Sequence, residues 1–414
     1  MSIKEKPAII GGEPASKHWI PIAKPIIGDE EKQAVMEALE KGALASGEFI
    51  EKFEKEFARY IGVKHAIATS CGTDALFISY LSLDLTFNKK ILTTPLTFIA
   101  TASAAICTGA IPIFADVEED ANISPEEISK VLEKEHIDGI CVVHMYGKPC
   151  RMEEILSMAR EYNIPVIEDA SHAHGAEYKG KKVGSLGDIA AFSLYPAKIL
   201  VAGGWGGVIV TNNDELAETA RLIALQGELR EVRGTKTAYE FARIGYNMRM
   251  SNIEAAVAYY QLRKLDKFIE IRRKYARILT EILEDVPGIK TPTDPAYGKH
   301  VYYLYVITID EKKIGWSRDE FVEALRKENI DARRGYHKPL HQQELFLKIN
   351  DPRVNYFAKI VKYPEYSKLS YPTAEKLSKT SVWLPCHPAL TEEDVENIGK
   401  AIRKLISWKT GKKL

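Results

Sequence analysis

Short apolar segments that alternate with helical stretches constrain the fold of this chain more than any other feature. From residue 64 onward the apolar segments lie at residues 65–69, 91–92, 111–114, 139–143 and 165–167. Amphipathic stretches with helical spacing separate several of them, as at residues 74–83 and 152–162. Strands that alternate with helices predict a mostly parallel sheet with both faces covered. The expected fold class is therefore α/β.

The pattern changes near residue 253 and predicts a second, smaller domain. Residues 253–284 form one long helical stretch with many charges, which we expect to bridge two domains. We place the boundary so that residues 1–268 form a large domain, with an N-terminal arm and two amphipathic helices within residues 28–60. Residues 269–414 then form a small C-terminal α+β domain.

Local signals within the small domain predict its elements. Residues 301–307 are mostly aromatic and β-branched, which predicts a strand. Ser317 followed three residues later by Glu320 predicts a capping box at the start of a helix that ends near residue 328. Thr391 stands at the same spacing before an acidic residue and predicts the start of a final helix.

The charge balance excludes a bulk basic or acidic field. Lys and Arg number 57 among 414 residues, Asp and Glu also number 57, and the formal net charge at pH 7 is zero. Such a chain has no general attraction for nucleic acid or an anionic membrane. Residues 91–115 are uncharged, but Pro95 and Pro112 favour a buried strand–helix–strand over a membrane span. Because the N-terminus lacks an apolar signal core, we expect a cytoplasmic protein.

Cysteine and histidine spacing gives no metal site. The five cysteines are scattered and form no C-x-x-C pair, which argues against a zinc knuckle or a disulfide framework. His337 and His341 have helical spacing, but Pro339 between them breaks any shared helix face, so a loop role is expected. The basic run at residues 333–337 either contacts a carboxylate or phosphate or is a solvated charge run.

The segment from residue 167 to 211 holds the strongest candidates for chemistry. Asp169 follows an apolar strand, at the carboxyl end where open α/β sheets place ligands. Lys198 lies between another apolar strand and a glycine-rich turn, and residues 189–200 contain no second basic residue. Apolar surroundings lower the pKa of a lysine and make it a nucleophile, although periodicity alone favours a surface lysine at a strand end.

A second candidate is the passage from strand to helix at residues 69–76. Free backbone N–H groups at a helix start, with a glycine that permits close approach, form a cradle for a phosphate. An ordinary helix cap by Thr73 is the alternative.

Read together and in order, several short motifs resemble the DegT/DnrJ/EryC1/StrS aminotransferases. The motifs lie at residues 71–76, 95–101, 168–175, 192–198, 204–211 and 245–250, and the resemblance covers about residues 20–405. It implies a pyridoxal 5′-phosphate (PLP) enzyme of the type I aspartate-aminotransferase fold. In that fold helices sandwich a mostly parallel mixed sheet in the large domain, and a smaller α+β domain follows.

The resemblance also assigns roles around the cofactor ring. It implies that Lys198 forms the Schiff base with the PLP aldehyde and later moves the proton at the substrate carbon. Asp169 would pair with the pyridine nitrogen and keep it protonated. Phe98 would stack on the ring, and His172 would face the phenolic oxygen, which leaves His174 structural rather than part of a metal pair.

Four further residues are assigned to the phosphate. Gly72 and Thr73 would hold it through backbone N–H groups and Ser193 through its hydroxyl. Asn247 would reach the phosphate of the neighbouring subunit, so the resemblance implies a homodimer with shared active sites.

Two nearby positions depart from the family pattern: Cys71 replaces a usual Ser or Asn, and Trp205 replaces a frequent acidic residue in the glycine turn. Since a thiol is a poor donor, no side-chain bond from residue 71 to the phosphate is expected.

The implied reaction moves an amino group from glutamate or glutamine to a keto group of a nucleotide-linked sugar. Short matches at residues 9–14, 334–336, 372–376 and 382–385 resemble a subgroup that acts on keto-cyclitols such as scyllo-inosose, so that acceptor is an alternative. A PLP-dependent sugar dehydratase is another. Relatives with that activity replace the lysine by histidine, so Lys198 favours transamination. A nicotinamide dehydrogenase is remote, because residues 203–207 do not fit G-x-G-x-x-G.

Overall fold

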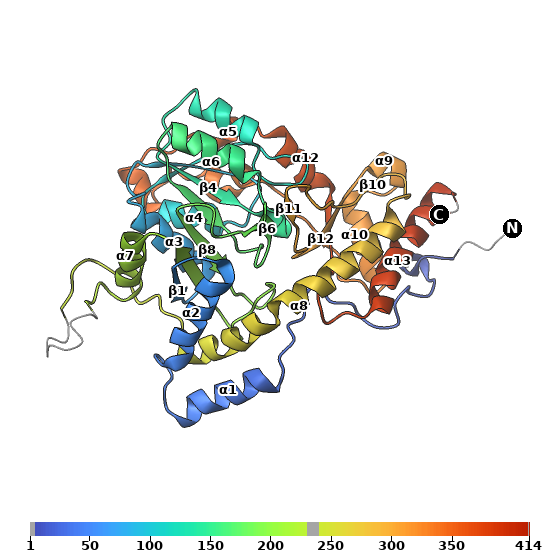
Figure 1. Cartoon of the computed structure of the whole chain (residues 1–414). Coiled ribbons are helices and arrows are strands. Elements are labelled where there is room, and N and C mark those ends of the chain that lie inside the picture. Colours follow the sequence, from blue (N-terminus) through green and yellow to red (C-terminus); the bar gives the residue numbers. More distant parts are fainter. Residues whose placement is uncertain (1–4, 230–239, 413) are drawn as a thin grey trace.

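A mixed seven-stranded sheet forms the centre of the large domain in the computed structural model, which describes residues 5–229, 240–412 and 414 (Figure 1). The spatial order is β1 (His65–Thr69), β9 (Gly207–Thr211), β8 (Ile189–Ser193), β5 (Val166–Asp169), β4 (Gly139–Val143), β2 (Lys90–Thr93) and β3 (Ile111–Phe114). Strands β8, β5, β4, β2 and β3 pair in parallel, whereas β9 is antiparallel to both neighbours. The α/β prediction is confirmed.

Helices cover both faces of this sheet, which explains why its strands are apolar along their length rather than alternating. One face packs on α3 (Gly72–Ser82), α4 (Ala100–Cys107) and α7 (Asp214–Ala224). The other packs on α2 (Glu48–Ile61), α5 (Pro125–Leu132), α6 (Met152–Glu161) and the first half of α8 (Asn252–Leu283). Helix α1 (Asp29–Glu40) packs on α8, so the two predicted N-terminal helices are confirmed.

Helix α8 is the long predicted helix, and it runs from the large domain into the small one (Figure 1). The small sheet has the order β10 (Ile289–Lys290), β12 (Tyr305–Ile309), β14 (Ser381–Leu384) and β13 (Arg333–Arg334). Around it lie α9 (Glu311–Ile314), α10 (Arg318–Lys327), α12 (Pro372–Thr380) and α13 (Glu392–Thr410). Both predicted caps are confirmed, since Ser317 and Thr391 each close a capping box.

The strand predicted at residues 301–307 begins only at Tyr305. Before that point the chain bonds to a loop of the large domain: the amides of Val301 and Tyr303 donate to the carbonyls of Gly147 (3.0 Å) and Tyr146 (2.9 Å). Tyr302 between them has a left-handed φ of 49°, which no strand residue adopts. The prediction was therefore wrong for residues 301–304, because a contact between domains replaces the strand there.

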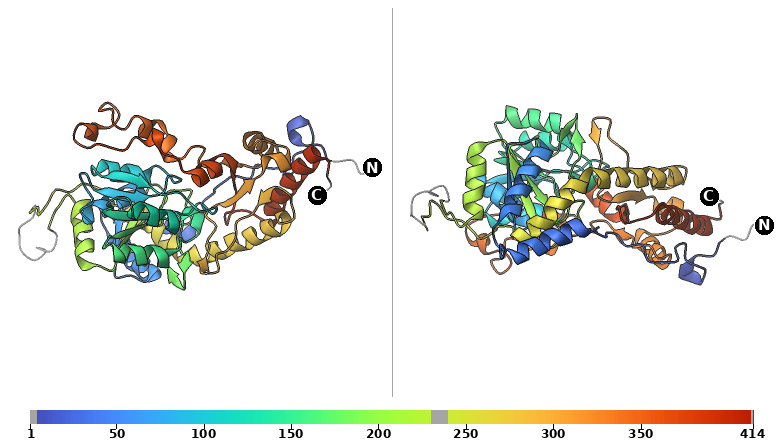
Figure 2. Two further views of the ribbon diagram at one scale, coloured as in Figure 1. Left: turned by 90° about the horizontal axis from the view of Figure 1, so that it is seen from above. Right: turned by 60° about the horizontal axis from the view of Figure 1, so that its bottom comes forward.

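One segment of the predicted small domain packs on the predicted large domain. Residues 336–371, which include α11 (Glu344–Leu347), lie along the large domain near the edge strand β3 (Figure 2, orange to red), where Tyr366 Oη donates to the carbonyl of Pro112 (2.5 Å). Asp116 of the large domain accepts from the first amides of α12, those of Thr373 and Ala374. The boundary at 268/269 remains a prediction.

Two smaller features complete the fold. A three-stranded sheet joins β11 (Gly298–Lys299) to the hairpin of β6 (Glu177–Tyr178) and β7 (Lys181–Lys182). Across the described ranges, none of the helices has the length and apolarity needed to cross a membrane.

Candidate active site

The candidate residues gather at one edge of the large sheet. Asp169 ends β5 and Ser193 ends β8, while helix α3 begins just after β1. Strands β5 and β8 are parallel, so their carboxyl ends meet at the same edge. Open α/β sheets bind ligands there, because helix N-termini and loops converge on that edge.

Asp169 is buried and held in one orientation. Its Oδ2 accepts from Thr101 Oγ1 (2.8 Å) and its Oδ1 from the amide of Ser171 (3.1 Å). Thr97 Oγ1 lies 3.0 Å from Thr101 Oγ1 and extends the chain of hydroxyls. Only 4 % of the Asp169 surface is exposed. The site therefore presents a fixed carboxylate to whatever binds beside it.

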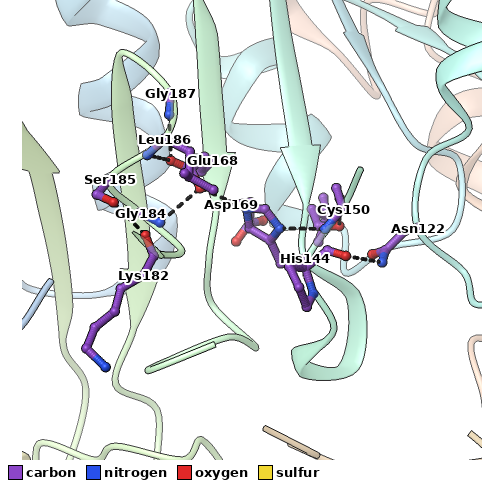
Figure 3. Close-up of polar contacts among 12 residues, drawn as sticks. Asn122, His144, Cys150, Glu168, Asp169, Lys182, Gly184, Ser185, Leu186 and Gly187 are labelled. Carbon is purple, nitrogen blue, oxygen red and sulfur yellow. Dashed lines mark hydrogen bonds and ion pairs between the residues drawn. The ribbon is translucent and has the colours of Figure 1, made fainter. Parts of the chain in front are cut away.

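Glu168, the residue before Asp169 in β5, anchors the end of this strand through a buried hydrogen-bond network (Figure 3). Glu168 is fully buried, and three loop amides donate to its oxygens at 2.7–2.9 Å: those of Gly184, Leu186 and Gly187. His144 Nε2 donates at 3.0 Å, since its Nδ1 accepts from the amide of Cys150. Burial acts to raise the pKa of Glu168, but the hydrogen bonds from His144 and the loop amides lower it on balance. The amide of His144 also donates to the Asp169 carbonyl at 3.2 Å, which ties the network to the site.

Lys198 has the environment expected of a nucleophilic amine. Burial lowers its pKa to about 8, although the nearby charge of Asp169 acts in the opposite direction. Its Nζ lies over the ring of Tyr303, 4.8 Å from the centroid. A lysine with this pKa is partly neutral near pH 7, whereas an ordinary lysine is almost fully charged.

His172 lies between two tyrosines. Its ring is 4.5 Å from that of Tyr303, with 25° between the planes, and nearly parallel to that of Tyr146, 6.4 Å away. Burial lowers the pKa of His172 well below its usual value, helped by the charge of Lys198, so the imidazole is neutral. Its Nδ1 is buried and has no partner among the described residues. A buried polar atom of this kind is suited to a ligand.

Sequence reasoning missed Tyr303 and the arginine that positions it. Arg272 lies in α8, and its Nη1 donates to the carbonyls of Tyr302 (3.3 Å), Tyr303 (3.1 Å) and Cys386. Burial lowers the pKa of Arg272 to about 10. In the sequence Arg272 is one charge among many on a long helix, and nothing there distinguishes it. Arg272 holds the backbone of Tyr303, the residue that covers Lys198.

The start of α3 forms a close cradle. A Cβ at Gly72 would lie 2.6 Å from the Cβ of Ser193, so only glycine fits. The amides of Gly72 and Thr73 begin the helix and have no intrahelical partner. The cap is Cys71, whose Sγ accepts from the amide of Asp74 (3.4 Å), so Thr73 is not the cap that the alternative prediction named. Free amides and the positive end of the helix dipole favour an anion.

Three other residues named from the sequence lie at the surface. Phe98, which follows β2, is 58 % exposed, and Trp205 is 64 % exposed and packs against Tyr195. Asn247 is exposed, and its Oδ1 accepts from Arg249 Nε (2.9 Å). The neighbouring amide of Ser70 donates to the carbonyl of Met248, which brings this loop close to the start of α3.

The remaining histidines have structural surroundings. His174 is buried, and burial lowers its pKa to about 3. His341 is buried beside Glu375, 3.3 Å from Nε2 to Oε1, and His337 lies apart on the surface. Among the residues that the structure describes, no three His, Cys, Asp or Glu side chains form a group that could hold a metal ion.

Comparison with known proteins places this geometry in a family. Residues 25–403 match the DegT/DnrJ/EryC1/StrS aminotransferase family. The spore coat polysaccharide biosynthesis protein SpsC of Bacillus subtilis is 34 % identical over 395 residues, which cover 94 % of this chain and 97 % of SpsC. GDP-perosamine synthase of Caulobacter vibrioides is 32 % identical over 393 residues, covering 94 % and 98 %. The structure of Helicobacter pylori PseC, an aminotransferase involved in pseudoaminic acid biosynthesis, superposes with a TM-score of 0.85 at 28 % identity, covering 95 % of this chain and all of PseC.

Proposed function

The chain belongs to the DegT/DnrJ/EryC1/StrS aminotransferase family, and from this premise we propose that it transfers an amino group from glutamate or glutamine to the keto group of a nucleotide-linked sugar. It is an aminotransferase with PLP as its cofactor. The proposed acceptor is supported by relatives whose names state a nucleotide-sugar product, such as GDP-perosamine synthase. The observation that carries the proposal is the joint position of Lys198, Asp169 and the start of α3 at one sheet edge.

The residues at this edge fit PLP. A Cβ at Gly72 would overlap Ser193, so the glycine lets the start of α3 lie directly beside the Ser193 hydroxyl. Asp169 offers a fixed carboxylate, and His172 has an unpartnered buried nitrogen. This donor set matches a molecule with a phosphate, a basic ring nitrogen and an oxygen on the ring.

The proposed contacts follow from these chemical types. The amides of Gly72 and Thr73 and the hydroxyl of Ser193 bind the phosphate, and no strong basic field is required. Asp169 would hold a proton on the pyridine nitrogen, and the exposed Phe98 ring would stack on the cofactor. When bound, PLP supplies an electron sink for the bond that breaks at the substrate carbon.

Lys198 is proposed to bind the cofactor covalently and to move the proton at the substrate α-carbon. Its lowered pKa gives a neutral fraction at neutral pH, which could condense with the cofactor's aldehyde as water leaves and could later accept a proton. Tyr303 covers the amine and limits access of water. His172 stays neutral, so it donates one hydrogen bond without adding a charge beside Lys198.

We also propose a homodimer in which Asn247 acts on the partner's phosphate. The support is its exposed position on a loop whose neighbours Phe241 and Ile244 are 54 % and 87 % exposed. Large apolar side chains that are this exposed favour burial against another surface.

An assay of both half-reactions tests the proposed function. The purified enzyme is loaded with PLP, and an amino donor converts the cofactor to its amine form. The enzyme is then offered an NDP-4-keto-6-deoxyhexose, an NDP-3-ketosugar or scyllo-inosose. The proposal predicts that one of the nucleotide-linked ketosugars restores the absorbance spectrum of the PLP form and yields an amino sugar. Amination of inosose alone would identify a keto-cyclitol enzyme, and release of water or ammonia without transfer would identify a dehydratase.

A further inference from the structure

Arg333 points from the small domain toward the candidate site. It lies directly opposite Trp383 in the pairing of β13 with β14, so the two side chains share one face of the small sheet. On that face Trp383 packs edge-on against Tyr146 and Tyr336, and its Nε1 lies 3.3 Å from Tyr146 Oη. Since Tyr146 also stacks with His172, this face borders the active site.

The next residue has the opposite orientation. Arg334 lies opposite Val382, on the other face of the sheet, where its Nη1 is 3.3 Å from Asp319 Oδ2. Arg333 and Arg334 therefore carry the same charge, lie in the same strand and are similarly exposed (53 % and 49 %), but only Arg333 faces the site.

Asp331 holds Arg333 through one edge of its guanidinium group. Nε and Nη2 donate to the two oxygens of Asp331, at 3.2 and 2.8 Å. Asp331 is itself nearly buried and accepts from the amide of Ile22 in the N-terminal arm (3.2 Å). In the part of the chain that the structure describes, no protein group accepts from Nη1. The outer edge of Arg333 thus presents preoriented N–H donors and no acceptor.

Tyr303 is close to both groups. Its ring covers the Lys198 amine. Burial raises the pKa of its phenol, and the positive charge of nearby Arg333 acts to lower it. A group bound by Arg333 therefore lies near the ring that covers the reacting nitrogen. In extended glutamate the side-chain carboxyl carbon is about 5 Å from the amino nitrogen and the α-carboxyl carbon about 2.5 Å, from bond lengths of about 1.5 Å. Of the two carboxylates, the side-chain one reaches farther from the amino nitrogen, and we assign it to the guanidinium on the small domain.

We propose that Arg333 binds the side-chain carboxylate of the amino donor and thereby selects glutamate over glutamine. This inference rests on the proposed aminotransferase function. A carboxylate offers two acceptors to the free guanidinium edge, whereas a carboxamide offers one acceptor and turns an NH₂ group toward other donors. A site built from donors alone disfavours the amide, because one N–H donor then faces an NH₂ group and loses a charge-assisted hydrogen bond. Asp331 is the positioning residue that orients the edge.

Two readouts test this inference on the PLP-loaded enzyme. The first is the rate at which glutamate or glutamine converts the cofactor to its amine form. The second is the dissociation constant of glutarate, an unreactive dicarboxylate, measured by the change in cofactor absorbance. The variants are R333A, R333K and D331N, with R334A as the matched control.

The expected result is a selective loss. R333A lowers kcat/KM for glutamate roughly 10- to 100-fold, the range for a hydrogen bond to a charged group, and leaves glutamine within about threefold. Glutarate binding weakens by a similar factor, R333K recovers part of the loss, D331N has an intermediate effect, and R334A matches the wild type. An equal loss with both donors, a wild type that prefers glutamine, or a change confined to the ketosugar KM would overturn the inference.

Failure of the proposed function has a different signature. If the wild type converts no donor, the aminotransferase proposal fails. Glutarate binding that is lost in R333A but kept in R334A would still support the carboxylate site. Glutarate binding that is unchanged in R333A would reject it.

Discussion

The amine of Lys198 lies 4.8 Å from the centroid of the Tyr303 ring, so a residue of the small domain covers the nucleophile of the large domain. The contact depends on Arg272, which holds the Tyr303 backbone, and on the bond between the Tyr303 amide and Tyr146. The environment that lowers the lysine pKa is therefore completed by the junction of the two domains.

Removing the Tyr303 ring should raise the pKa of Lys198. Because burial is what lowers this pKa to about 8, Tyr303→Ala admits water and moves it toward the usual value near 10.4. The pH at which half of the apoenzyme binds PLP covalently, followed by absorbance, should rise by about one unit. Tyr303→Phe keeps the ring and should behave as the wild type. An unchanged midpoint in Tyr303→Ala would show that the ring does not set the pKa.

Filling the cradle at Gly72 should weaken PLP binding. In Gly72→Ala the new Cβ meets Ser193 at 2.6 Å, which displaces either the helix start or the hydroxyl. We expect the dissociation constant for PLP, measured by fluorescence quenching, to rise at least tenfold, or about 1.4 kcal/mol. Gly204→Ala is the control, because its Cβ would meet nothing closer than 3.5 Å. Equal effects of the two variants would contradict a phosphate cradle at Gly72.

Buried neutral histidines should make the fold sensitive to acid. Burial lowers the pKa of His174 and His300 to about 3 and that of His387 to about 4. As the pH falls below about 6.5, the unfolded chain takes up protons that the folded chain does not, so stability present at pH 7 is lost toward pH 4. Each such histidine accounts for about 2 kcal/mol between pH 7 and pH 5.

Urea unfolding at the two pH values measures this effect. His174→Asn should reduce the difference in the free energy of unfolding by about 2 kcal/mol, whatever its effect at pH 7. The control is His136→Asn, since the side chain of His136 is 82 % exposed. A pH dependence that is the same in His174→Asn and the wild type would show that His174 takes up its proton in the folded state.

Mixing two inactive variants tests the shared active site. Asn247→Asp places a negative charge beside the proposed phosphate of the partner subunit, and Lys198→Ala lacks the nucleophile. If Asn247 acts across the interface, a hybrid dimer has one site with both native residues, and mixing restores up to a quarter of the wild-type activity in a statistical exchange. If it acts within its own chain, every site in the mixture carries a defect and no activity returns.

Local signals explain which parts of the fold were predictable. The capping boxes at Ser317 and Thr391 involve residues three positions apart, so the sequence contains the whole interaction. The position of Asp169 follows from the apolar strand before it, and the lowered pKa of Lys198 agrees with its apolar neighbourhood.

Contacts between distant residues explain what was missed. Arg272 bonds to Cys386, 114 positions away, and its charged helix gave no sign of burial. Residues 301–304 have the composition of a strand, but the loop at residues 146–147 competes for their amides. These long-range contacts bring the rings of Tyr303 and Tyr146 to His172, so no local pattern predicts the arrangement.

The absorbance spectrum of the PLP-bound protein tests the central claim most directly. Lysine-bound PLP absorbs at about 400–430 nm. The account predicts this band in the wild type, its loss in Lys198→Ala, and its retention in Lys182→Ala, a lysine on the hairpin β6–β7 paired with Glu177. The absence of the band from the wild type, or an unchanged band in Lys198→Ala, would contradict it.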